Sequence, residues 1–191
     1  MTPYQISALA QIAELSVQCE AATQFPAEIS AAQCIQESGW LKVAPGNNCF
    51  GIKCVAGQPG EAEATHEYVK GERLAVEAIF ATYPSLLDCF TAHAKLLQAG
   101  RYLPAWQRYQ ADHNLDRLIV GIAAAGYSTD AAYVSEVTRI AHEAPVTAAL
   151  AKARAARRAA QVELAAATAP ATPATPTAAG GQAPAGGTST T

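Results

Sequence analysis

Glu37 is the first residue whose type and position could carry chemistry. It stands at the end of a helix expected over residues 26–37, which Ser38-Gly39 would stop. The negative end of a helix dipole disfavours a carboxylate there, and Trp40 can shield the side chain from water. Both effects raise the pKa of a carboxyl group, as a general acid working near neutral pH requires. An ordinary exposed glutamate at a helix end is the simpler alternative from physics alone.

Glu37 lies within the first of three short motifs spaced along the chain. They are AQCIQESGW at 32–40, NNCFGIK at 47–53 and AGYSTDAAY at 125–133. Residues 64–83 alternate between apolar and polar types around Lys70-Gly71, which predicts a β-hairpin between the second and third motifs. In content and order these elements resemble the bacterial endo-β-N-acetylglucosaminidases of glycoside hydrolase family 73, which include flagellar muramidase domains and many autolysins.

The resemblance covers about residues 4–144 and departs from the family's pattern at three positions. Leu41 stands where the family often has Gly, Ser128 replaces Ala and Ala131 replaces Pro. None of these changes removes a titratable group. The resemblance therefore implies an intact glycoside hydrolase that acts on peptidoglycan and uses neither a metal nor an organic cofactor.

Carried over residue by residue, the resemblance makes Glu37 the general acid. In the expected hairpin, residues 65–68 match the strand in which the family carries a second acidic residue, which points to Glu67. The competing candidates are Glu61, Glu63 and Glu72. Tyr127 is the third catalytic candidate, with a hydroxyl that would position water or the substrate's acetamido group. A tyrosine that packs between two helices is the alternative for Tyr127.

Two carboxyl groups are what glycosidic hydrolysis needs. One protonates the leaving oxygen, and the other activates water or stabilises the oxocarbenium-like centre. With an N-acetyl sugar, the substrate's own amide is a further candidate nucleophile. The sequence therefore leaves the choice between a retaining and an inverting mechanism open.

Six further residues are candidates for substrate binding: Trp40, Asn48, Phe50, Lys53, Tyr83 and Asp130. Asn48, Phe50 and Lys53 would shape the floor of the cleft. Trp40 and Tyr83 can offer apolar ring faces to sugars, and a place in the core is the alternative for Trp40. Asp130 also fits a cap of the following helix. His93 lies on an apolar stripe, which favours a core histidine over a catalyst.

Composition restricts the partners. The chain has 191 residues, of which 50% are hydrophobic and 15% charged, and its net charge is −3. Residues 145–191 carry +3, which leaves −6 on residues 1–144. An acidic globular part argues against nucleic acid, because phosphate binding requires a basic face. The longest uncharged stretches lack large aliphatic residues, so we expect no membrane span. The family resemblance implies peptidoglycan glycan strands as the partner, and we expect a monomer.

The resemblance implies a location at the bacterial cell wall or periplasm. Residues 1–5 contain no basic residue, and the apolar positions that follow are interrupted, so we expect no Sec signal peptide. This leaves three routes open: a phage-type lysin, a secreted effector, or export by another pathway.

Five cysteines stand at positions 19, 34, 49, 54 and 89, and an odd number cannot pair completely within one chain. Cys49 and Cys54 are close enough in sequence to bridge across a loop, while the other three fall on expected helices. A zinc site on Cys49, Cys54 and His66 is disfavoured, because the cysteine spacing is poor and no second pair follows. We expect ordinary buried or loop thiols and no metal.

Hydrophobic periodicity predicts a mostly helical α+β fold in which the hairpin is the β part. Helices are expected over 4–18 and 26–37, between Ser85 and Gly100, at 104–110, from Asn114 to Gly126, after Asp130 and over 146–167. The resemblance adds a lysozyme-like architecture. We predict a catalytic domain at 1–145, an Ala/Arg-rich helical extension at 146–167 and an Ala/Thr/Pro/Gly-rich disordered tail at 168–191. The basic run 154–158 is expected to form a solvated helix face.

The predicted function is hydrolysis of the β-1,4 bond after N-acetylglucosamine in peptidoglycan. A lytic transglycosylase is the nearest alternative, since those enzymes also carry Gln-Glu-Ser at a helix end. The Gly-Leu-Met-Gln segment that usually follows in them is absent here. A non-catalytic wall-binding or assembly module is the other alternative, and the presence of both Glu37 and Glu67 argues against it.

Overall fold

The helices and strands follow the order expected from the sequence. The structure is a computed structural model that describes residues 1–69 and 72–168, with the backbone alone for residues 64–69 and 72–76. The helices are α1 (Pro3–Thr23), α2 (Ala27–Ser38), α3 (Leu86–Leu97), α4 (Leu103–Asp112), α5 (Leu115–Ala124), α6 (Tyr133–His142) and α7 (Ala144–Thr168). The strands are β1 (Gly60–Val69) and β2 (Glu72–Ala81). The predicted tail beyond Thr168 lies outside the described residues.

The first two helices show what begins and ends them. α1 starts with a capping box: the Thr2 hydroxyl accepts from the Gln5 amide, and the Gln5 side chain accepts from the Thr2 amide. It continues to Thr23, beyond the expected end at residue 18, because the added turn packs Cys19 into the core. α2 ends at Ser38, as expected, because Gly39 adopts a left-handed conformation with a φ of 58°.

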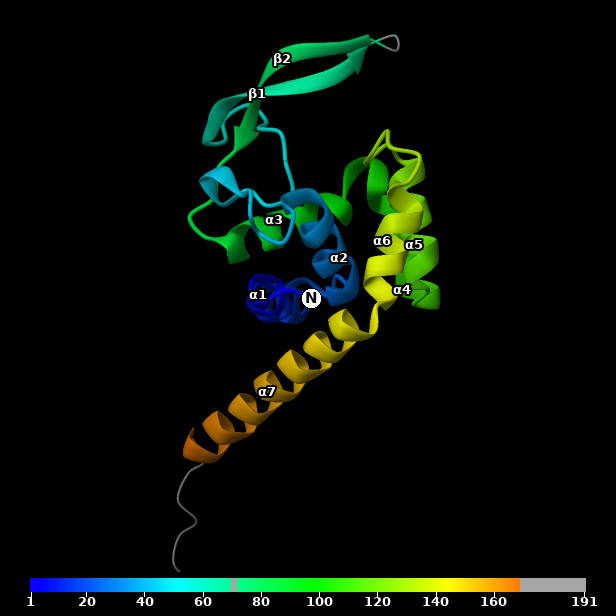
Figure 1. Ribbon diagram of the computed structural model, residues 1–191. Coiled ribbons are helices and arrows are strands. Elements are labelled where there is room, and N and C mark those ends of the chain that lie inside the picture. Colours follow the sequence, from blue (N-terminus) through cyan, green and yellow to red (C-terminus); the bar gives the residue numbers. More distant parts are fainter. Residues whose placement is uncertain (70–71, 169–191) are drawn as a thin grey trace, which may run out of the picture.

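α2 is the central helix, and α1, α6 and α7 pack against it (Figure 1). Its buried residues surround most of its circumference: Ala27, Ile29, Ser30, Ala31, Ala32, Gln33, Cys34, Ile35 and Ser38. Small Ala and Ser side chains allow the neighbouring helices to approach closely. Ile29 is fully buried, and burial of such a side chain stabilises the fold by about 1.5–3 kcal/mol. The last turn of α2 is therefore held in place by a dense core.

The hairpin rises from the side of the helical body on which α2 ends (Figure 1). β1 and β2 are antiparallel, with Gly60 opposite Ala81 and Val69 opposite Glu72. This confirms the predicted hairpin, although β1 begins at residue 60, earlier than the alternating pattern indicated. Lys70 and Gly71, the predicted turn, lie outside the described residues.

Backbone contacts at its base join the hairpin to the body. The Ala81 amide donates to the Ile52 carbonyl oxygen at 2.9 Å. Residues 45–47 form a short 3-10 turn. Within it, Gly46 has a φ of 54°, and a Cβ at this position would lie 2.5 Å from the Cγ2 atom of Thr82. Only glycine therefore allows this turn to approach the end of β2 so closely.

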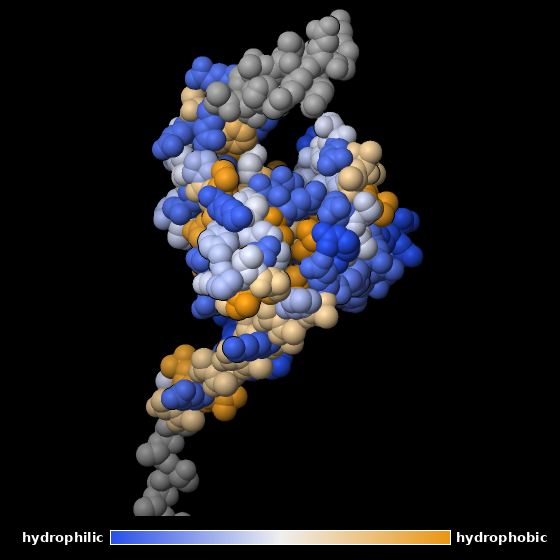
Figure 2. All heavy atoms as spheres, in the orientation of Figure 1, coloured by the Kyte–Doolittle hydropathy of each residue, from blue (hydrophilic) through white to orange (hydrophobic). Residues whose placement is uncertain are grey.

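α7 begins on the body and then extends away from it (Figure 1). Val146 and Leu150 are fully buried, whereas Val162 and Leu164 are 70% and 65% exposed. Figure 2 shows apolar residues gathered toward this outer end. The predicted boundary at residue 145 thus falls within packed structure, and the division into domains stays a prediction. Among the described helices, α7 included, none has both the length and the apolarity to cross a membrane.

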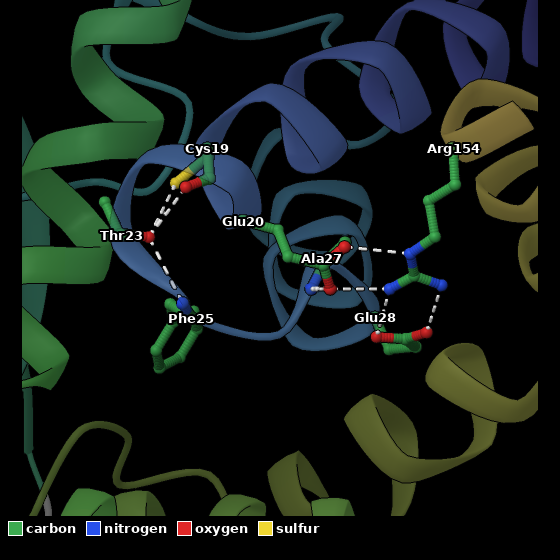
Figure 3. Close-up of polar contacts among 7 residues, drawn as sticks. All are labelled: Cys19, Glu20, Thr23, Phe25, Ala27, Glu28 and Arg154. Carbon is green, nitrogen blue, oxygen red and sulfur yellow. Dashed lines mark hydrogen bonds and ion pairs between the residues drawn. The ribbon is translucent and has the colours of Figure 1, made fainter. Parts of the chain in front are cut away.

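Arg154 joins α7 to both α1 and α2 (Figure 3). Its guanidinium donates to Glu20 at 2.6 and 2.8 Å and to Glu28 at 2.8 and 3.1 Å. Glu20 also accepts from the Ala27 amide at the start of α2, at 3.1 Å. Arg157 and Arg158 are exposed, as expected, but Arg154 is not. The prediction of a fully solvated basic run is wrong at Arg154, because two acidic residues far away in the sequence meet there.

A groove of about 760 Å³ lies between α1 and α7. Its walls are mainly apolar and small residues, among them Ile6, Leu9, Val17 and Ala153. Neither Glu37 nor Tyr127 lines it. The groove is therefore separate from the residues that could carry chemistry.

Candidate active site

Glu37 lies in the last turn of α2, where the backbone is held on both sides. The Gly39 amide donates to the Ile35 carbonyl oxygen, and the Ser38 hydroxyl accepts from the Leu41 amide at 2.8 Å. The Glu37 side chain reaches solvent, yet the surrounding protein raises the pKa of its carboxyl group through burial. Such a carboxyl keeps its proton to a higher pH than a free glutamate and can donate it to a bound molecule.

Tyr127 and Tyr133 lie close to Glu37. Burial raises the pKa of both hydroxyls, and the negative charge of Glu37 raises each further. Tyr127 is partly exposed, Tyr133 is fully buried, and their ring centroids are 5.5 Å apart. The structure thus brings together two of the three predicted catalytic residues, Glu37 and Tyr127, although they are on different elements.

Gln33 supports this arrangement from one turn earlier on α2. Its Nε2 atom donates to the Tyr133 hydroxyl at 2.5 Å, and both residues are buried. This hydrogen bond connects the end of α2 to the start of α6. A buried donor and acceptor that satisfy each other hold the two elements in one relative position.

His93 on α3 lies behind Tyr127. Its Nε2 atom is 3.1 Å from the Tyr127 hydroxyl oxygen. The imidazole is fully buried and stacks on Phe50, with ring centroids 3.8 Å apart and an interplanar angle of 2°. Burial lowers the pKa of His93 to about 3, so the ring is neutral. The prediction of a core histidine is confirmed, and this histidine also contacts a candidate catalytic residue.

The loop at 47–53 is organised by Asn48. The Asn48 Nδ2 atom donates to the carbonyl oxygens of Ile52 and Ala81, both at 2.9 Å, and its Oδ1 atom accepts from the Ile52 amide at 3.0 Å. Asn48 and Phe50 are both buried. They shape the loop from within, and their contact with substrate stays a prediction. The backbone of Lys53 forms an isolated antiparallel β-bridge with that of Phe80 at the base of the hairpin.

Trp40 and Tyr83 are both partly exposed and pack against the edge of the core. Trp40 follows the end of α2 with a φ of 69°, and its carbonyl oxygen accepts from the Tyr4 hydroxyl at 2.9 Å. Burial is the main cause that raises the pKa of Tyr83 to about 12. Each residue thus remains partly open to solvent at the edge of the core.

Asp130 is exposed in the turn before α6. Its Oδ1 atom accepts from the Ala132 amide at 2.9 Å, and its carbonyl oxygen accepts from the Tyr133 amide at 3.1 Å. These contacts form a turn just before α6, whose N-cap residue is Ala132 and which has no side-chain cap, so Asp130 does not cap the helix in the way the sequence suggested.

Glu67, the predicted second carboxylate, lies on β1 opposite Leu74. Its side chain is outside the described residues, as are those of His66 and Glu72. Among the competitors on the same strand, Glu61 is exposed and Glu63 is partly exposed. The choice of the second carboxylate stays a prediction.

Three buried thiols meet beneath the loop at 47–53. The Sγ atoms of Cys49 and Cys89 are 3.9 Å apart, and Cys49 also contacts Cys34. All five cysteines are free, which confirms ordinary thiols over a bridge between Cys49 and Cys54. Within the described part of the chain, no group of three histidine, cysteine or acidic side chains could hold a metal ion.

Four residues around the site were not assigned to it from the sequence: Gln33, His93, Tyr102 and Tyr133. Gln33 carried a usable signal, because it precedes Glu37 by four residues and shares its side of the helix. Tyr133 carried another as the last residue of the third motif. No signal in the sequence pointed to His93 or Tyr102 as part of the site. The ring centroid of Tyr102 lies 6.2 Å from that of Tyr127. The place of His93 and Tyr102 depends on how α3 and the following turn pack.

A protonatable carboxyl at the end of a central helix, beside tyrosine hydroxyls and on the same side as a hairpin, fits a lysozyme-like glycoside hydrolase domain. Residues 13–145 match the family model described as glucosaminidase, mannosyl-glycoprotein endo-beta-N-acetylglucosaminidase. The match covers more than half of the chain, which belongs to this glucosaminidase family. The resemblance drawn from the motifs and the class of enzyme are thereby confirmed.

Known proteins with similar sequences or folds agree with this assignment. The peptidoglycan hydrolase FlgJ of Vibrio cholerae is 35% identical over 120 residues, which are 57% of this chain and 34% of that protein. The chain thus spans about a third of that relative's length. The catalytic domain of the autolysin Auto from Listeria monocytogenes superposes with a TM-score of 0.66 at 22% identity, over 78% of this chain and 89% of that chain. A C-terminally truncated glycoside hydrolase domain of Salmonella typhimurium FlgJ gives 0.57 at 26% identity, over 72% and 95%. The lysozyme-like fold is confirmed.

Proposed function

We propose that the protein hydrolyses the β-1,4 bond that follows N-acetylglucosamine in peptidoglycan glycan strands. The observation that carries the proposal is the position of Glu37, which lies in the last turn of α2 and close to Tyr127 in a chain of the glucosaminidase family. The raised pKa of its carboxyl group agrees with a role as an acid. The similarity to a protein named as a peptidoglycan hydrolase supports the choice of substrate. The enzyme acts as a monomer at the bacterial cell wall or periplasm and needs no metal or organic cofactor.

In this mechanism Glu37 is the general acid. It donates its proton to the glycosidic oxygen while the bond to the sugar breaks. Glu67 on the hairpin is the proposed second carboxylate, which activates water or stabilises the oxocarbenium-like centre. Tyr127 positions water or the acetamido group of the sugar. Trp40 and Tyr83 are proposed to contact the sugar rings through their exposed parts.

Digestion of purified peptidoglycan tests the proposal. Released fragments are reduced with borohydride and identified by mass spectrometry. We expect fragments that end in reduced N-acetylglucosamine. Reduced N-acetylmuramic acid at the ends would contradict the proposed bond, and 1,6-anhydro ends would show a lytic transglycosylase. Binding to sedimented peptidoglycan without release of fragments would show a wall-binding module.

The second carboxylate is tested with three matched variants on β1, each measured in the same digestion assay. Glu67→Gln is expected to lower activity by about 100-fold or more, because a carboxylate at the reacting centre is lost. Glu61→Gln and Glu63→Gln are expected to stay within about twofold of wild type. If Glu67→Gln is mild and one of the other two is severe, the role moves to that residue.

A further inference from the structure

The hydrogen bond between His93 and Tyr127 has a direction that matters for the site. We infer that His93 donates its Nε2–H to the Tyr127 hydroxyl, which leaves the hydroxyl's own proton free to point toward Glu37 and the bound sugar. His93 is then a positioning residue that acts through Tyr127. The inference rests on the role proposed above for Tyr127.

The surroundings of His93 make its ring neutral. Phe50 stacks on one face, and the ring of Phe25 meets it edge-on with centroids 6.3 Å apart. The whole residue is inaccessible to solvent. A charged imidazolium in this apolar position would be strongly destabilised, and burial accordingly lowers the pKa to about 3. A neutral imidazole carries one proton, on either Nδ1 or Nε2.

The Nδ1 atom decides between these two tautomers. It is buried and has no hydrogen-bond partner among the described residues. A proton on Nδ1 would leave a buried N–H donor unpaired, which is costly and rare in folded proteins. A proton on Nε2 leaves only an unpaired acceptor at Nδ1, which occurs more often, and forms the 3.1 Å hydrogen bond to Tyr127. The Nε2–H tautomer is therefore favoured.

This tautomer determines what Tyr127 offers to a ligand. A phenolic hydroxyl has one proton and can also accept hydrogen bonds. Because Tyr127 accepts from His93, its proton is not used in the core. Tyr133 follows the same pattern, since its hydroxyl accepts from Gln33 Nε2 at 2.5 Å. Two core N–H donors thus hold two tyrosine hydroxyls near Glu37, and of these two tyrosines only Tyr127 is partly exposed, so its free proton can reach a bound ligand. In the opposite tautomer, the Tyr127 hydroxyl would donate its proton to His93 Nε2 and offer only lone pairs to a ligand.

The wild-type protein allows a direct test of the tautomer. Two-bond ¹⁵N–¹H correlation spectra of protein labelled with ¹⁵N-histidine show which ring nitrogen carries the proton. The sequence contains four histidines, and the set of signals missing in His93→Gln identifies His93. We expect a neutral ring protonated on Nε2. A ring protonated on Nδ1 or on both nitrogens would overturn the inference, whatever the enzymatic activity.

Kinetics on soluble glycan strands test the positioning role. His93→Phe keeps the ring stack and removes the donor, and we expect it to lower kcat about tenfold, the order of one lost hydrogen bond, with little change in KM. His93→Gln keeps an N–H donor and is expected to recover most of this loss. In a Tyr127→Phe background, His93→Phe is expected to cause no further loss.

Several outcomes would contradict the positioning role. Additive losses in the double variant, or equal losses in His93→Gln and His93→Phe at equal Tm, would show a structural role alone. Wild-type activity in Tyr127→Phe would overturn both this inference and the proposed role of Tyr127. A wild-type protein that releases no fragments would refute the proposed function, while the spectra would still report the direction of the hydrogen bond.

Discussion

The two ends of α2 hold glutamates in opposite electrostatic settings. Glu28 is in the first turn, and burial by itself would raise the pKa of its carboxyl group. Hydrogen bonds from Arg154 and from the backbone outweigh burial, so the pKa of Glu28 is lowered. Glu37 is in the last turn, and burial raises its pKa. The helix dipole acts in the same two directions, since it favours a negative charge only at the N-terminal end.

The difference separates a glutamate that stabilises the fold from the glutamate that is proposed to act as the acid. At the N-terminal end the carboxylate is ionised and joined to α7, where it stabilises the packing of three helices. At the C-terminal end the carboxyl group retains its proton more readily and faces solvent. A pairing residue like Arg154 beside Glu37 would lower the pKa and remove the acid that the proposed reaction needs.

The largest expected effect comes from removing the acid. Glu37→Gln is expected to lower the rate of peptidoglycan digestion by about 100- to 10,000-fold, the usual contribution of a general acid, with no loss of Tm. Glu28→Gln is the matched control on the same helix. It is expected to keep activity within about twofold at 25 °C and to lower Tm. Digestion rates and thermal unfolding of both variants check the contrast, and a Glu37→Gln protein with full activity would refute it.

Truncation tests how much of α7 the catalytic part needs. Removal of residues 146–191 takes away Val146, Leu150 and Arg154, and loss of the two buried side chains costs about 1.5–3 kcal/mol each. We expect Tm to fall by about 10 °C or more, because each kcal/mol shifts Tm by about 2–4 °C in a protein of this size. Removal of residues 161–191 keeps these contacts and is expected to leave Tm unchanged. Equal Tm values for the two truncations would support a stable domain that ends at residue 145.

Arg154 itself is expected to have an intermediate effect. Arg154→Met leaves Glu20 and Glu28 without their shared cation in a partly buried position, which we expect to cost about 2 kcal/mol. Arg158→Met, on an exposed part of the same helix, is the control and is expected to change stability by less than about 0.5 kcal/mol. Denaturant unfolding measures both. Equal stability of the two variants would show that the three charged groups contribute little net energy.

The smallest expected effect is a pH dependence of opposite sign at the two glutamates. The lowered pKa of Glu28 contributes stability above the ordinary value of 4.5, and this is lost as pH falls through the folded-state pKa. The raised pKa of Glu37 contributes stability that is fully present below 4.5 and is lost as pH rises through the folded-state pKa. As the pH rises from 4 to 7, the Tm of Glu37→Gln should therefore rise relative to that of wild type. The Tm of Glu28→Gln should fall relative to that of wild type over the same range. Tm profiles that run parallel for all three proteins would contradict the opposite shifts.

Much of the fold could be predicted because its signals are local. Ser85 and Asn114 are the residues from which two helices were expected to start. Ser85 accepts from the Asp88 amide at the start of α3, and Asn114 accepts from the Arg117 amide at the start of α5. The hairpin followed from alternation around a turn. The ends of α1 and β1 were less predictable, because extra turns or strand pairs form where packing and pairing partners exist.

The candidate site divides in the same way. Glu37, Asn48 and Tyr127 belong to motifs that can be recognised in contiguous residues, and a position at a helix end already indicated a raised pKa for Glu37. The side-chain amide of Asn48 is fully used in hydrogen bonds to the backbone, and Asp130 accepts from the Ala132 amide. Both contacts could be recognised only from the folded backbone around them. The assignment of Glu67 as the second carboxylate rests only on the match of residues 65–68 to the family's strand.

By itself, the sequence determined the helical and hairpin elements and the family, and it singled out Glu37 as the proposed acid, because periodicity, caps and motifs are properties of neighbouring residues. Only the tertiary structure decided that Arg154 binds Glu20 and Glu28, which precede it by 134 and 126 positions. It also decided that His93 meets Tyr127, 34 positions away. The physical reason is that pairing and burial of polar groups depend on which surfaces the packed helices bring together, and that information is spread over the whole chain.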